Sequence, residues 1–378
     1  MAEWIDCKIA DLGTVIGGAT PSTKKLEYYE HGSIAWITPK DLSTFRGRYI
    51  RRGERNITEI GLKSCSTQLL PKNTVLFSSR APIGYIAIAE NEVCTNQGFK
   101  SVIPNENTDP LFLYYLLKYN KNKIESMGSG TTFKEVSGNT LKNIIVSVPR
   151  DKKVQEKISS ILGAIDNKIE ANEKINNNLS QQAKTIYQAW FEKFILSNGS
   201  CPPTWKRGIL ADIANITSGK RPLNKSDKKM KGFEIPLMGA TSIVGFTNKA
   251  NYTNKILVIG RVGTHGVIQR INSPCWASDN TLVITSNLYE YTFQVLQKID
   301  YHAMNRGSTQ PLITQADMNK VDILIPDNQT LHSFELIVGQ LMQKYETNLI
   351  ENTKLADLRD YLLPRLISGE LDISKVNI

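Results

Sequence analysis

Two stretches, ILGAIDNKIEANEKINNNL at Ile161–Leu179 and IVGQLMQKYETNLIENTKL at Ile337–Leu355, decide how this chain folds. They align without a gap at an offset of 176 residues and are identical at seven of nineteen positions. Apolar residues recur every three or four positions in both, which is the spacing of one face of an α-helix. The sequence therefore predicts two copies of one long helix.

Each helical pattern extends beyond the quoted stretch, and the first runs without a proline from about Asp151 to Leu196. Forty-odd residues rise roughly 60 to 70 Å, too far for one domain to enclose, so we expect the two helices to pack on each other. The residues expected at this contact are Ile158, Ile161, Ile165, Ile169, Asn172, Asn176, Leu179 and Ile186 in the first copy, and Ile337, Leu341, Tyr345, Asn348, Asn352, Leu355 and Leu362 in the second.

The connectivity of the chain predicts that the helices are antiparallel. The first helix runs from the first globular part to the second. Because the sequence repeats, the second helix should leave the second globular part as the first helix leaves the first. It must therefore run back along the first helix. The asparagines in the middle of both apolar stripes have two interpretations. Buried asparagine fixes the register of a helix pair at some cost in stability; alternatively, the middle of the pair is solvated or covered by another protein.

Three blocks ahead of each helix also repeat, in the same order. The first aligns Trp4–Lys24 with Trp205–Lys225 at an offset of 201. The second aligns the block from Leu76 with that from Leu257 at an offset of 181, which pairs Arg80 with Arg261. The third aligns the block from Gly130 with that from Gly307 at an offset of 177. A chance match of four blocks in order is improbable. We therefore divide the chain into a first globular domain (1–150), a first long helix (151–200), a second globular domain (201–327) and a second long helix with the C-terminal tail (328–378).

The globular parts have the pattern of α+β domains. Short β-rich runs bounded by Gly, Pro and Asn predict strands at 33–38, 74–78, 86–89, 256–260 and 281–285. One helix is expected in each part, at Pro110–Asn120 and at Tyr291–Met304. The predicted fold is thus two similar α+β domains separated by two long antiparallel helices.

Composition limits the classes of function. The chain of 378 residues has 46 Lys and Arg against 36 Asp and Glu, a net charge of +10, which favours a polyanion such as nucleic acid as partner. No apolar run reaches the ~18 residues needed to cross a membrane and the start of the chain lacks an export signal, so we expect a cytoplasmic protein. Five scattered cysteines without a CxxC pair predict reduced thiols, and no metal site or phosphate-binding loop is recognisable.

These motifs together resemble the specificity subunit of a Type I restriction-modification system, over essentially the whole chain. The residues that carry the resemblance are the opening Trp4 and Ala10-Asp11, GGATPS at Gly17–Ser22, SSRAPIG at Ser78–Gly84, RVGTHG at Arg261–Gly266, GSTQPL at Gly307–Leu312, and the helical strings NKIEANEKIN and LRDYLLPRLISGEL. The resemblance implies two target recognition domains, each reading one half of a split double-stranded DNA site, and helices that act as a spacer and docking scaffold.

The same resemblance implies that the chemistry belongs to partner subunits. It implies two methylation subunits that hold S-adenosylmethionine, and restriction subunits that use ATP and Mg; this chain would be non-catalytic, with no cofactor of its own. A protein of another class, a basic scaffold that binds nucleic acid or acidic partners without sequence preference, remains the alternative, and a steep salt dependence on any duplex would favour it.

The repeat also indicates where DNA would be read. Positions common to both halves cannot distinguish two half-sites, so base readout should lie where the halves differ. About twenty residues between Lys24 and Arg80 have no counterpart in the second half, and they include FRGRYIRRGER at Phe45–Arg55. Arginine can pair bidentately with guanine, whereas the lysine-rich Lys220–Lys231, taken as the equivalent stretch, suits phosphate attraction.

A solvated basic loop is the alternative interpretation for both stretches, and a turn-stabilising salt bridge is the alternative for Arg80 and Arg261. The candidate DNA-binding residues are Arg46, Arg48, Tyr49, Arg51, Arg52, Arg55, Arg80, Thr132, Lys134, Lys220, Arg221, Lys225, Lys228, Lys229, Arg261, Arg306 and Thr309.

Overall fold

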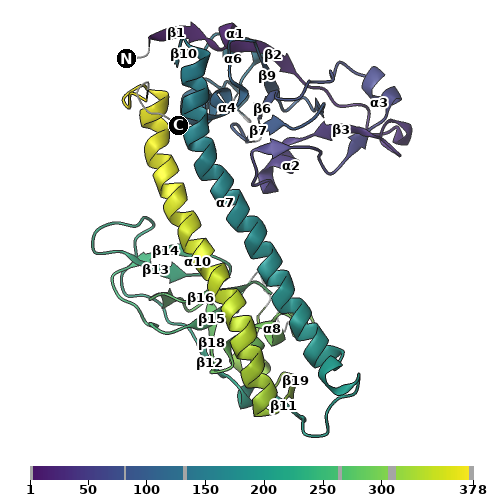
Figure 1. The fold of residues 1–378 in the computed structure, drawn as a ribbon, viewed down its shortest axis with the longest axis vertical. Coiled ribbons are helices and arrows are strands. Elements are labelled where there is room, and N and C mark those ends of the chain that lie inside the picture. Colours follow the sequence, from purple (N-terminus) through teal and green to yellow (C-terminus); the bar gives the residue numbers. More distant parts are fainter. Residues whose placement is uncertain (1–2, 81, 131–133, 263–265, 305–311, 374–378) are drawn as a thin grey trace. The chain divides into compact units, whose positions relative to one another are not determined.

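The computed structural model of the chain describes residues 3–80, 82–130, 134–262, 266–304 and 312–373. The chain forms two compact units, each of which joins a globular part to segments of two long helices (Figure 1). Unit 1 contains residues 1–173 and 349–378, and unit 2 contains residues 174–348. Both globular parts combine sheets with short helices, which confirms the predicted α+β class.

The described residues of unit 1 form three sheets. Its strands are β1 (Trp4–Lys8), β2 (Gly13–Gly17), β3 (Ile34–Ile37), β4 (Tyr49–Ile50), β5 (Asn56–Ile57), β6 (Val75–Phe77), β7 (Ile86–Ala89), β8 (Cys94–Thr95), β9 (Lys100–Pro104) and β10 (Ile145–Pro149). The five-stranded sheet has the order β2-β9-β6-β7-β4, the three-stranded sheet β5-β3-β8, and β1 pairs with β10. Short helices connect them: α1 (Ile9–Leu12), α2 (Pro39–Thr44), α3 (Glu59–Lys63), α4 (Pro110–Tyr119), α5 (Lys121–Ser126) and α6 (Gly138–Lys142).

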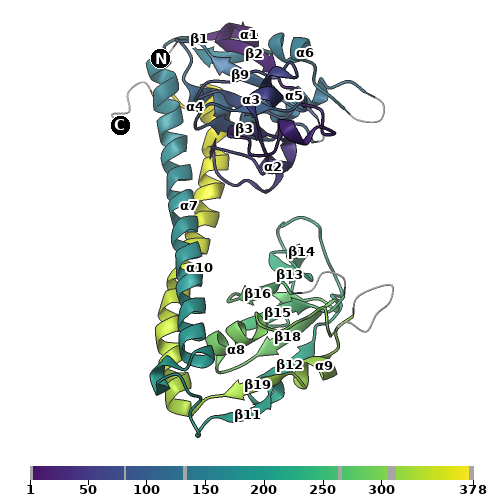
Figure 2. The same cartoon turned by 90° about the vertical axis from the view of Figure 1, so that its right-hand side faces the viewer.

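Helix α4 forms the centre of the unit 1 core, as its sequence predicts. The Asp109 side chain accepts a hydrogen bond from the Phe112 amide, and Pro110 at the first helical position needs no partner for its nitrogen, so both features favour a helix start here. Six consecutive residues from Phe112 to Leu117 are buried, because α4 lies between the five-stranded sheet and the long helices (Figure 2). Its Tyr115 hydroxyl donates to the buried Asp166 carboxylate at 2.6 Å.

Unit 2 repeats this plan with fewer elements. Its strands are β11 (Lys206–Ile209), β12 (Asn215–Ser218), β13 (Ile235–Met238), β14 (Ile243–Thr247), β15 (Ile256–Gly260), β16 (Ile268–Ile271), β17 (Trp276–Ala277), β18 (Thr281–Thr285) and β19 (Asp322–Ile325), and its short helices are α8 (Tyr289–Leu296) and α9 (Gln315–Asn319). The sheets have the orders β12-β18-β15-β16, β14-β13-β17 and β11-β19.

The helix predicted over Tyr291–Met304 is shorter than expected. It ends at Leu296, whose carbonyl accepts a hydrogen bond from the Tyr301 hydroxyl at 2.9 Å. The Asp300 side chain then accepts from the amides of His302 and Ala303, which fixes a turn instead of a further helical turn.

Backbone hydrogen bonds reveal the internal repeat directly. The Ala19 amide donates to Thr95 O at 3.0 Å, and the Lys220 amide donates to Ala277 O at 2.9 Å. Strand β3 pairs in parallel with β8 as β13 pairs with β17, so the offset is still 201 at Ile37 and Met238. The globular parts therefore share one framework as far as these strands.

Farther along, the structure moves the alignment by one residue. The Ser79 amide donates to Gly98 O, and in unit 2 the Arg261 amide donates to Asn280 O. The bridge between Arg80 and Glu135 likewise corresponds to the bridge between Val262 and Leu312. The offset is thus 182, and the predicted pairing of Arg80 with Arg261 is wrong: Arg261 corresponds to Ser79, and a one-residue slip in a strand reverses which face a side chain occupies.

The corrected offsets locate the extra residues of unit 1. The offset is 201 at β3. The bridge between Leu70 and Val93 corresponds to the bridge between Tyr252 and Cys275, and there the offset is 182. The difference, 201 − 182 = 19 residues, lies between 38 and 70, where unit 1 has α2, β4, β5 and α3 and unit 2 has the single strand β14.

The two long helices are α7 (Lys152–Tyr187) and α10 (Asn328–Ile367), and within each unit their segments lie antiparallel, as predicted. In unit 1, Arg359 bonds Asp166 at 2.8 Å and Asn352 bonds Asn172 at 2.8 Å, so numbers rise on one helix as they fall on the other. In unit 2, Tyr187 contacts the ring of Phe334. Helix α7 ends at Tyr187, and the next residues, Gln188–Glu192, form a π-helical turn.

The four asparagines form the same pair in each unit. Asn172 donates to Asn352 Oδ1 in unit 1, and Asn348, its counterpart, donates to Asn176 Oδ1 at 2.9 Å in unit 2. Asn172, Asn176 and Asn348 are buried. These contacts between helices favour the register interpretation over a solvated middle.

One expected packing position is wrong. Ile337 is 44% exposed, and Val338 and Met342 occupy the buried positions next to Phe334. These three follow one another at intervals of four, so Ile337 lies about 100° around the helix from their stripe. Of the other predicted apolar positions, Ile158 is buried, and Ile161, Ile165, Ile169, Leu179, Ile186, Leu341, Tyr345, Leu355 and Leu362 are partly buried.

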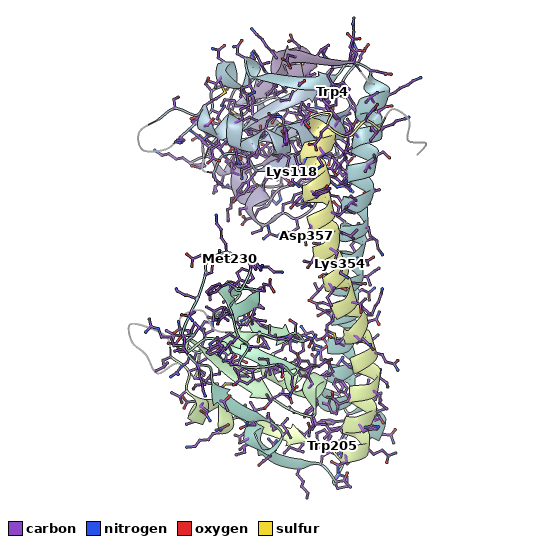
Figure 3. The ribbon with its side chains drawn as sticks, turned by 90° about the vertical axis from the view of Figure 1, so that its left-hand side faces the viewer. Trp4, Lys118, Trp205, Met230, Lys354 and Asp357 are labelled. Carbon is purple, nitrogen blue, oxygen red and sulfur yellow. The ribbon has the colours of Figure 1, made fainter. Side chains whose placement is uncertain are left out.

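The tryptophans that open the two halves lie beside opposite ends of α10 (Figure 3). In unit 2 the Trp205 indole donates to Asp327 at 2.9 Å, just before α10 begins. In unit 1 Trp4 packs against Gly369, where a Cβ would lie 2.6 Å from the indole and where φ is +77°, so only glycine fits.

Candidate nucleic-acid interface

The arginine-rich loop of unit 1 is held at its base by α2. The Asp41 side chain accepts from the Thr38 amide at the helix start and from the Glu54 amide at 2.7 Å on the far side of the loop. Strand β4 interrupts the loop and pairs in parallel with β7. The side chains of Arg46, Arg51, Arg52 and Arg55 are exposed, and Tyr49 is 41% exposed.

These cations are available to a polyanion to different degrees. The guanidinium of Arg55 stacks on the Tyr29 ring at 4.1 Å, which orients it. Among the described residues, Arg46, Arg51 and Arg52 form no ion pair. The structure therefore brings four predicted arginines to the surface of one loop, where phosphate or base edges could reach them.

Arg48 does not belong with them, which corrects the sequence-based expectation. Its side chain is 4% exposed, its Nε donates to Glu170 Oε1 at 3.0 Å, and it also bonds Asn167 and Gly163 O on α7. Burial disfavours its charged form, but the hydrogen bond and charge of Glu170 outweigh burial and raise the pKa of Arg48 above its usual value. Arg48 thus ties β4 to α7 and is closed to DNA.

Arg270 plays the corresponding part in unit 2, and sequence reasoning missed it. From β16 it bonds Glu290 on α8 at 2.6 and 2.8 Å and Glu346 on α10 at 2.9 Å. Burial opposes its charge, yet the hydrogen bond to Glu290 raises the pKa of Arg270. The available signal was the identity of Glu170 and Glu346 within the helical repeat.

The lysine-rich stretch of unit 2 has a different counterpart from the one expected. Because Lys220 corresponds to Ala19, the stretch Lys220–Lys231 matches residues 19–30 rather than Phe45–Arg55. The side chains of Lys220, Arg221, Lys225, Lys228 and Lys229 are all exposed. Arg221 and Lys225 line a hollow of about 910 Å³ together with Asp279 and Asn280.

The remaining candidates have mixed placements. Arg80 is half-buried and pairs with Glu135 at 3.5 Å, which matches the salt-bridge alternative. Lys134 is exposed. Arg261 is partly buried, and its Nε lies buried without a hydrogen-bond partner among the described residues. Thr132, Arg306 and Thr309 lie outside the described residues.

The described ranges contain neither a cluster of metal-ligating side chains nor a helix that could cross a membrane. No group of three His, Cys, Asp or Glu residues there could hold a metal ion. No helix in the part of the chain that is described is long and apolar enough to cross a membrane. Burial raises the pKa of the Cys94 and Cys275 thiols to about 11, which keeps both protonated at neutral pH.

Comparison with known proteins gives full-length matches. A family model described as "Type I restriction modification DNA specificity domain" matches residues 1–181 and 202–359. The Type I restriction enzyme MjaIX specificity subunit of Methanocaldococcus jannaschii is 33% identical over 99% of this chain and 95% of that protein. The HindI specificity subunit of Haemophilus influenzae is 20% identical over 98% of this chain and 100% of that protein.

A solved structure shares the fold. The crystal structure of a Type I restriction-modification S subunit from M. genitalium superposes with a TM-score of 0.64 at 19% sequence identity. The match covers 97% of this chain and 96% of that chain.

Proposed function

The chain belongs to the family of Type I restriction-modification specificity subunits, and we propose that it reads a split DNA site, one half with the globular part of each unit. A subunit of this family recognises target sequences and is non-catalytic. The observation that carries the proposal is that the two globular parts share a backbone framework but expose different basic loops. Two domains with the same backbone framework but different exposed side chains are suited to recognise two half-sites of different sequence.

The exposed cations supply affinity in this proposal. In unit 1 they are Arg46, Arg51, Arg52 and Arg55, and in unit 2 they are the cations of Lys220–Lys229. Each phosphate contact releases counterions, so binding should weaken steeply with salt. Salt dependence alone would also fit a nonspecific scaffold, and a preference for one split site is what separates the two.

The long helices act as a ruler in this proposal. They contain 36 and 40 residues, about 54 and 60 Å at 1.5 Å per residue, and their register is held by the paired asparagines. Dimeric DNA-binding proteins space their half-sites by the same kind of rigid geometry. The unread gap between half-sites should therefore follow helix length.

Partner subunits supply the chemistry. We expect two methylation subunits carrying S-adenosylmethionine and, in a complete system, restriction subunits that use ATP and Mg, acting in the compartment that holds the DNA. The chain by itself should bind no S-adenosylmethionine, and the complex with its methylation subunit should bind it. Cofactor bound by the isolated chain in calorimetry would contradict this division.

Lengthening both helices tests the ruler. Seven residues inserted after Lys174 and seven after Ile350, at matching positions of the repeat, keep both asparagine pairs and add about two turns, or ~10 Å, with only ~20° of rotation. The gap in the methylated motif should lengthen by about three base pairs at 3.4 Å each. Methylation-site sequencing that finds the parent gap in this variant would contradict the ruler.

A further inference from the structure

The turn between β8 and β9 in unit 1 and the turn between β17 and β18 in unit 2 have the same backbone. In the first, the Phe99 amide donates to Asn96 O, and in the second the Thr281 amide donates to Ser278 O. At the offset of 182, Gln97 and Asp279 occupy the same position in these turns, and both side chains are exposed. One backbone position thus carries an amide in one unit and a carboxylate in the other.

A second loop is pressed against each turn. A Cβ on Gly18 would lie 2.2 Å from Thr95 O, and a Cβ on Gly219 would lie 2.0 Å from Ser278 O. These glycines let the following residues approach the turn, and the next residue but one is Thr20 in unit 1 and Arg221 in unit 2. The loop and the turn therefore approach each other at equivalent positions in both units.

The side chains at these positions differ in chemistry between the units. In unit 1 the Thr20 hydroxyl donates to Gln97 Oε1. In unit 2 Arg221 and Asp279 line the same hollow of about 910 Å³. A hydroxyl with an amide in one unit corresponds to a guanidinium with a carboxylate in the other.

The carboxylate of Asp279 is unusual in its surroundings. The other charged residues that line the hollow are Arg221 and Lys225, both cationic, and Asp279 makes no hydrogen bond or ion pair with any described residue. A free carboxylate repels phosphate and only accepts hydrogen bonds. On a surface that binds DNA, a suitable partner is an exocyclic amino group of a base.

We infer that these pairs are base-reading positions: Arg221 with Asp279 reads a G·C pair in one half-site, and Thr20 with Gln97 reads an A·T pair in the other. Arginine matches O6 and N7 of guanine, and a carboxylate accepts from N4 of the paired cytosine. Glutamine matches N6 and N7 of adenine, and the threonine methyl can contact the thymine methyl. The inference rests on the proposed function and adds which residues choose the bases.

A double exchange tests the inference. The variant Arg221→Thr with Asp279→Gln gives unit 2 the pair of unit 1, and it would be expressed with the methylation subunit in a host whose methylated sites are sequenced. One position of the second half-site should change from G·C to A·T while the first half-site and the gap stay the same. The matched control is Lys249→Thr with Glu234→Gln, exposed residues of unit 2 that do not line the hollow and lie outside Lys220–Lys229, and it should keep the parent motif.

If the double variant methylates too few sites for its motif to be determined, DNA binding can be measured instead. Competition binding by the purified complex would compare duplexes that differ at single positions of the parent site. Asp279→Asn should lose about ten-fold or more of the preference at one base pair of the second half-site and little elsewhere.

Three results would be decisive. An unchanged preference at every position, or an equal change caused by the control, would overturn the inference and leave the proposed function standing. A parent chain that yields no split motif would instead contradict the proposed function itself.

Discussion

Unit 1 and unit 2 attach their globular parts to the long helices through equivalent glutamates but through arginines at different positions. Glu170 and Glu346 are 176 residues apart, the offset of the helical repeat. Arg48 directly precedes β4, a strand without a counterpart in the described residues of unit 2, whereas Arg270 comes from β16, at the position that Ile88 of β7 occupies in unit 1.

The two arginines nonetheless reach the same place in their units. The Ile88 amide donates to Arg48 O at 2.7 Å, so Arg48 lies beside the residue that corresponds to Arg270. The glutamates on the helices thus occupy equivalent positions of the sequence repeat. The arginines of the globular parts occupy different sequence positions but equivalent places in the two structures. A globular part can therefore gain a segment such as 39–63 if it still offers a guanidinium to the helix glutamate.

The largest expected effect is that of Arg270→Met. It would leave Glu290, 5% exposed, without its cation, and Glu346, 15% exposed, with only Lys255 at 3.7 Å. Breaking a buried ion pair in this way costs about 3–5 kcal/mol. Urea unfolding should show that loss, and Arg207→Met, an exposed arginine of β11, should change stability by about 0.5 kcal/mol or less. A loss no larger than in the control would show that the ion pairs do not hold unit 2 together.

Arg48→Met should cost less than Arg270→Met. Glu170 keeps 26% of its side chain exposed, so water can solvate its carboxylate once the arginine is gone. We expect a loss of about 2–3 kcal/mol in the same unfolding experiment, with Arg46→Met as the exposed control. If Arg48→Met were the more damaging change, the difference in burial would not explain the two attachments.

Some features of these attachments and of the fold can be predicted from the sequence, and others cannot. Periodicity and self-alignment predicted the helices, the α+β class and helix positions that are mostly buried or partly buried, because these depend on apolar spacing, and connectivity predicted the antiparallel course. They could not separate Arg48 from Arg46 and Arg51, because the alternation of buried and exposed side chains from Arg48 to Arg51, a stretch that includes β4, turns Arg48 inward. They misaligned Arg80 with Arg261 because identical letters outweighed a one-residue shift that only backbone hydrogen bonds reveal.

The base-reading pairs were hidden for a related reason. Thr20 and Gln97 are 77 residues apart, and nothing local in the sequence indicates that they touch. Arg221 was a candidate for its charge alone, and Asp279 was overlooked because an acidic residue does not stand out in a search for basic patches. The tertiary contact between loop and turn supplies this information.

A smaller difference between the units is expected from the residues that start their helices. Asp327 accepts from the Thr330 amide and the Trp205 indole, and these bonds lower the pKa of its carboxyl. Its contribution to stability is therefore present above the ordinary carboxyl pKa near 4 and is lost as the pH falls through its lower folded value. Because asparagine can keep the cap and only the charge is lost, Asp327→Asn should destabilise the chain by about 0.5 kcal/mol at pH 6.

Unfolding midpoints of parent and Asp327→Asn, followed with pH, should converge as the pH falls through the lowered pKa of Asp327. The matched change is Asp151→Asn in unit 1, where Asp151 accepts from the Lys153 amide and, within the described residues, Trp4 donates no hydrogen bond to it. A constant difference between Asp327→Asn and parent down to low pH would contradict the assigned role of the charge.

The smallest loss of stability is expected at the paired asparagines. Asn348 Oδ1 is buried without a partner among the described residues, so replacing Asn176 and Asn348 together by leucine should raise stability by about 1 kcal/mol or leave it unchanged. The same variant should lose register, seen as a mixture of gap lengths in the methylated motif. A single parent gap would show that the asparagines do not set the register.

The central claim, that each globular part reads its own half-site, is tested most directly by exchanging residues 39–63 for the equivalent segment of a family member with a different target. The measurement is sequencing of methylated sites in a host that expresses the exchanged chain with the methylation subunit. The account predicts a split motif in which the first half-site changes while the gap and the second half-site match the parent. A change in the second half-site, or a motif with no division, would contradict it.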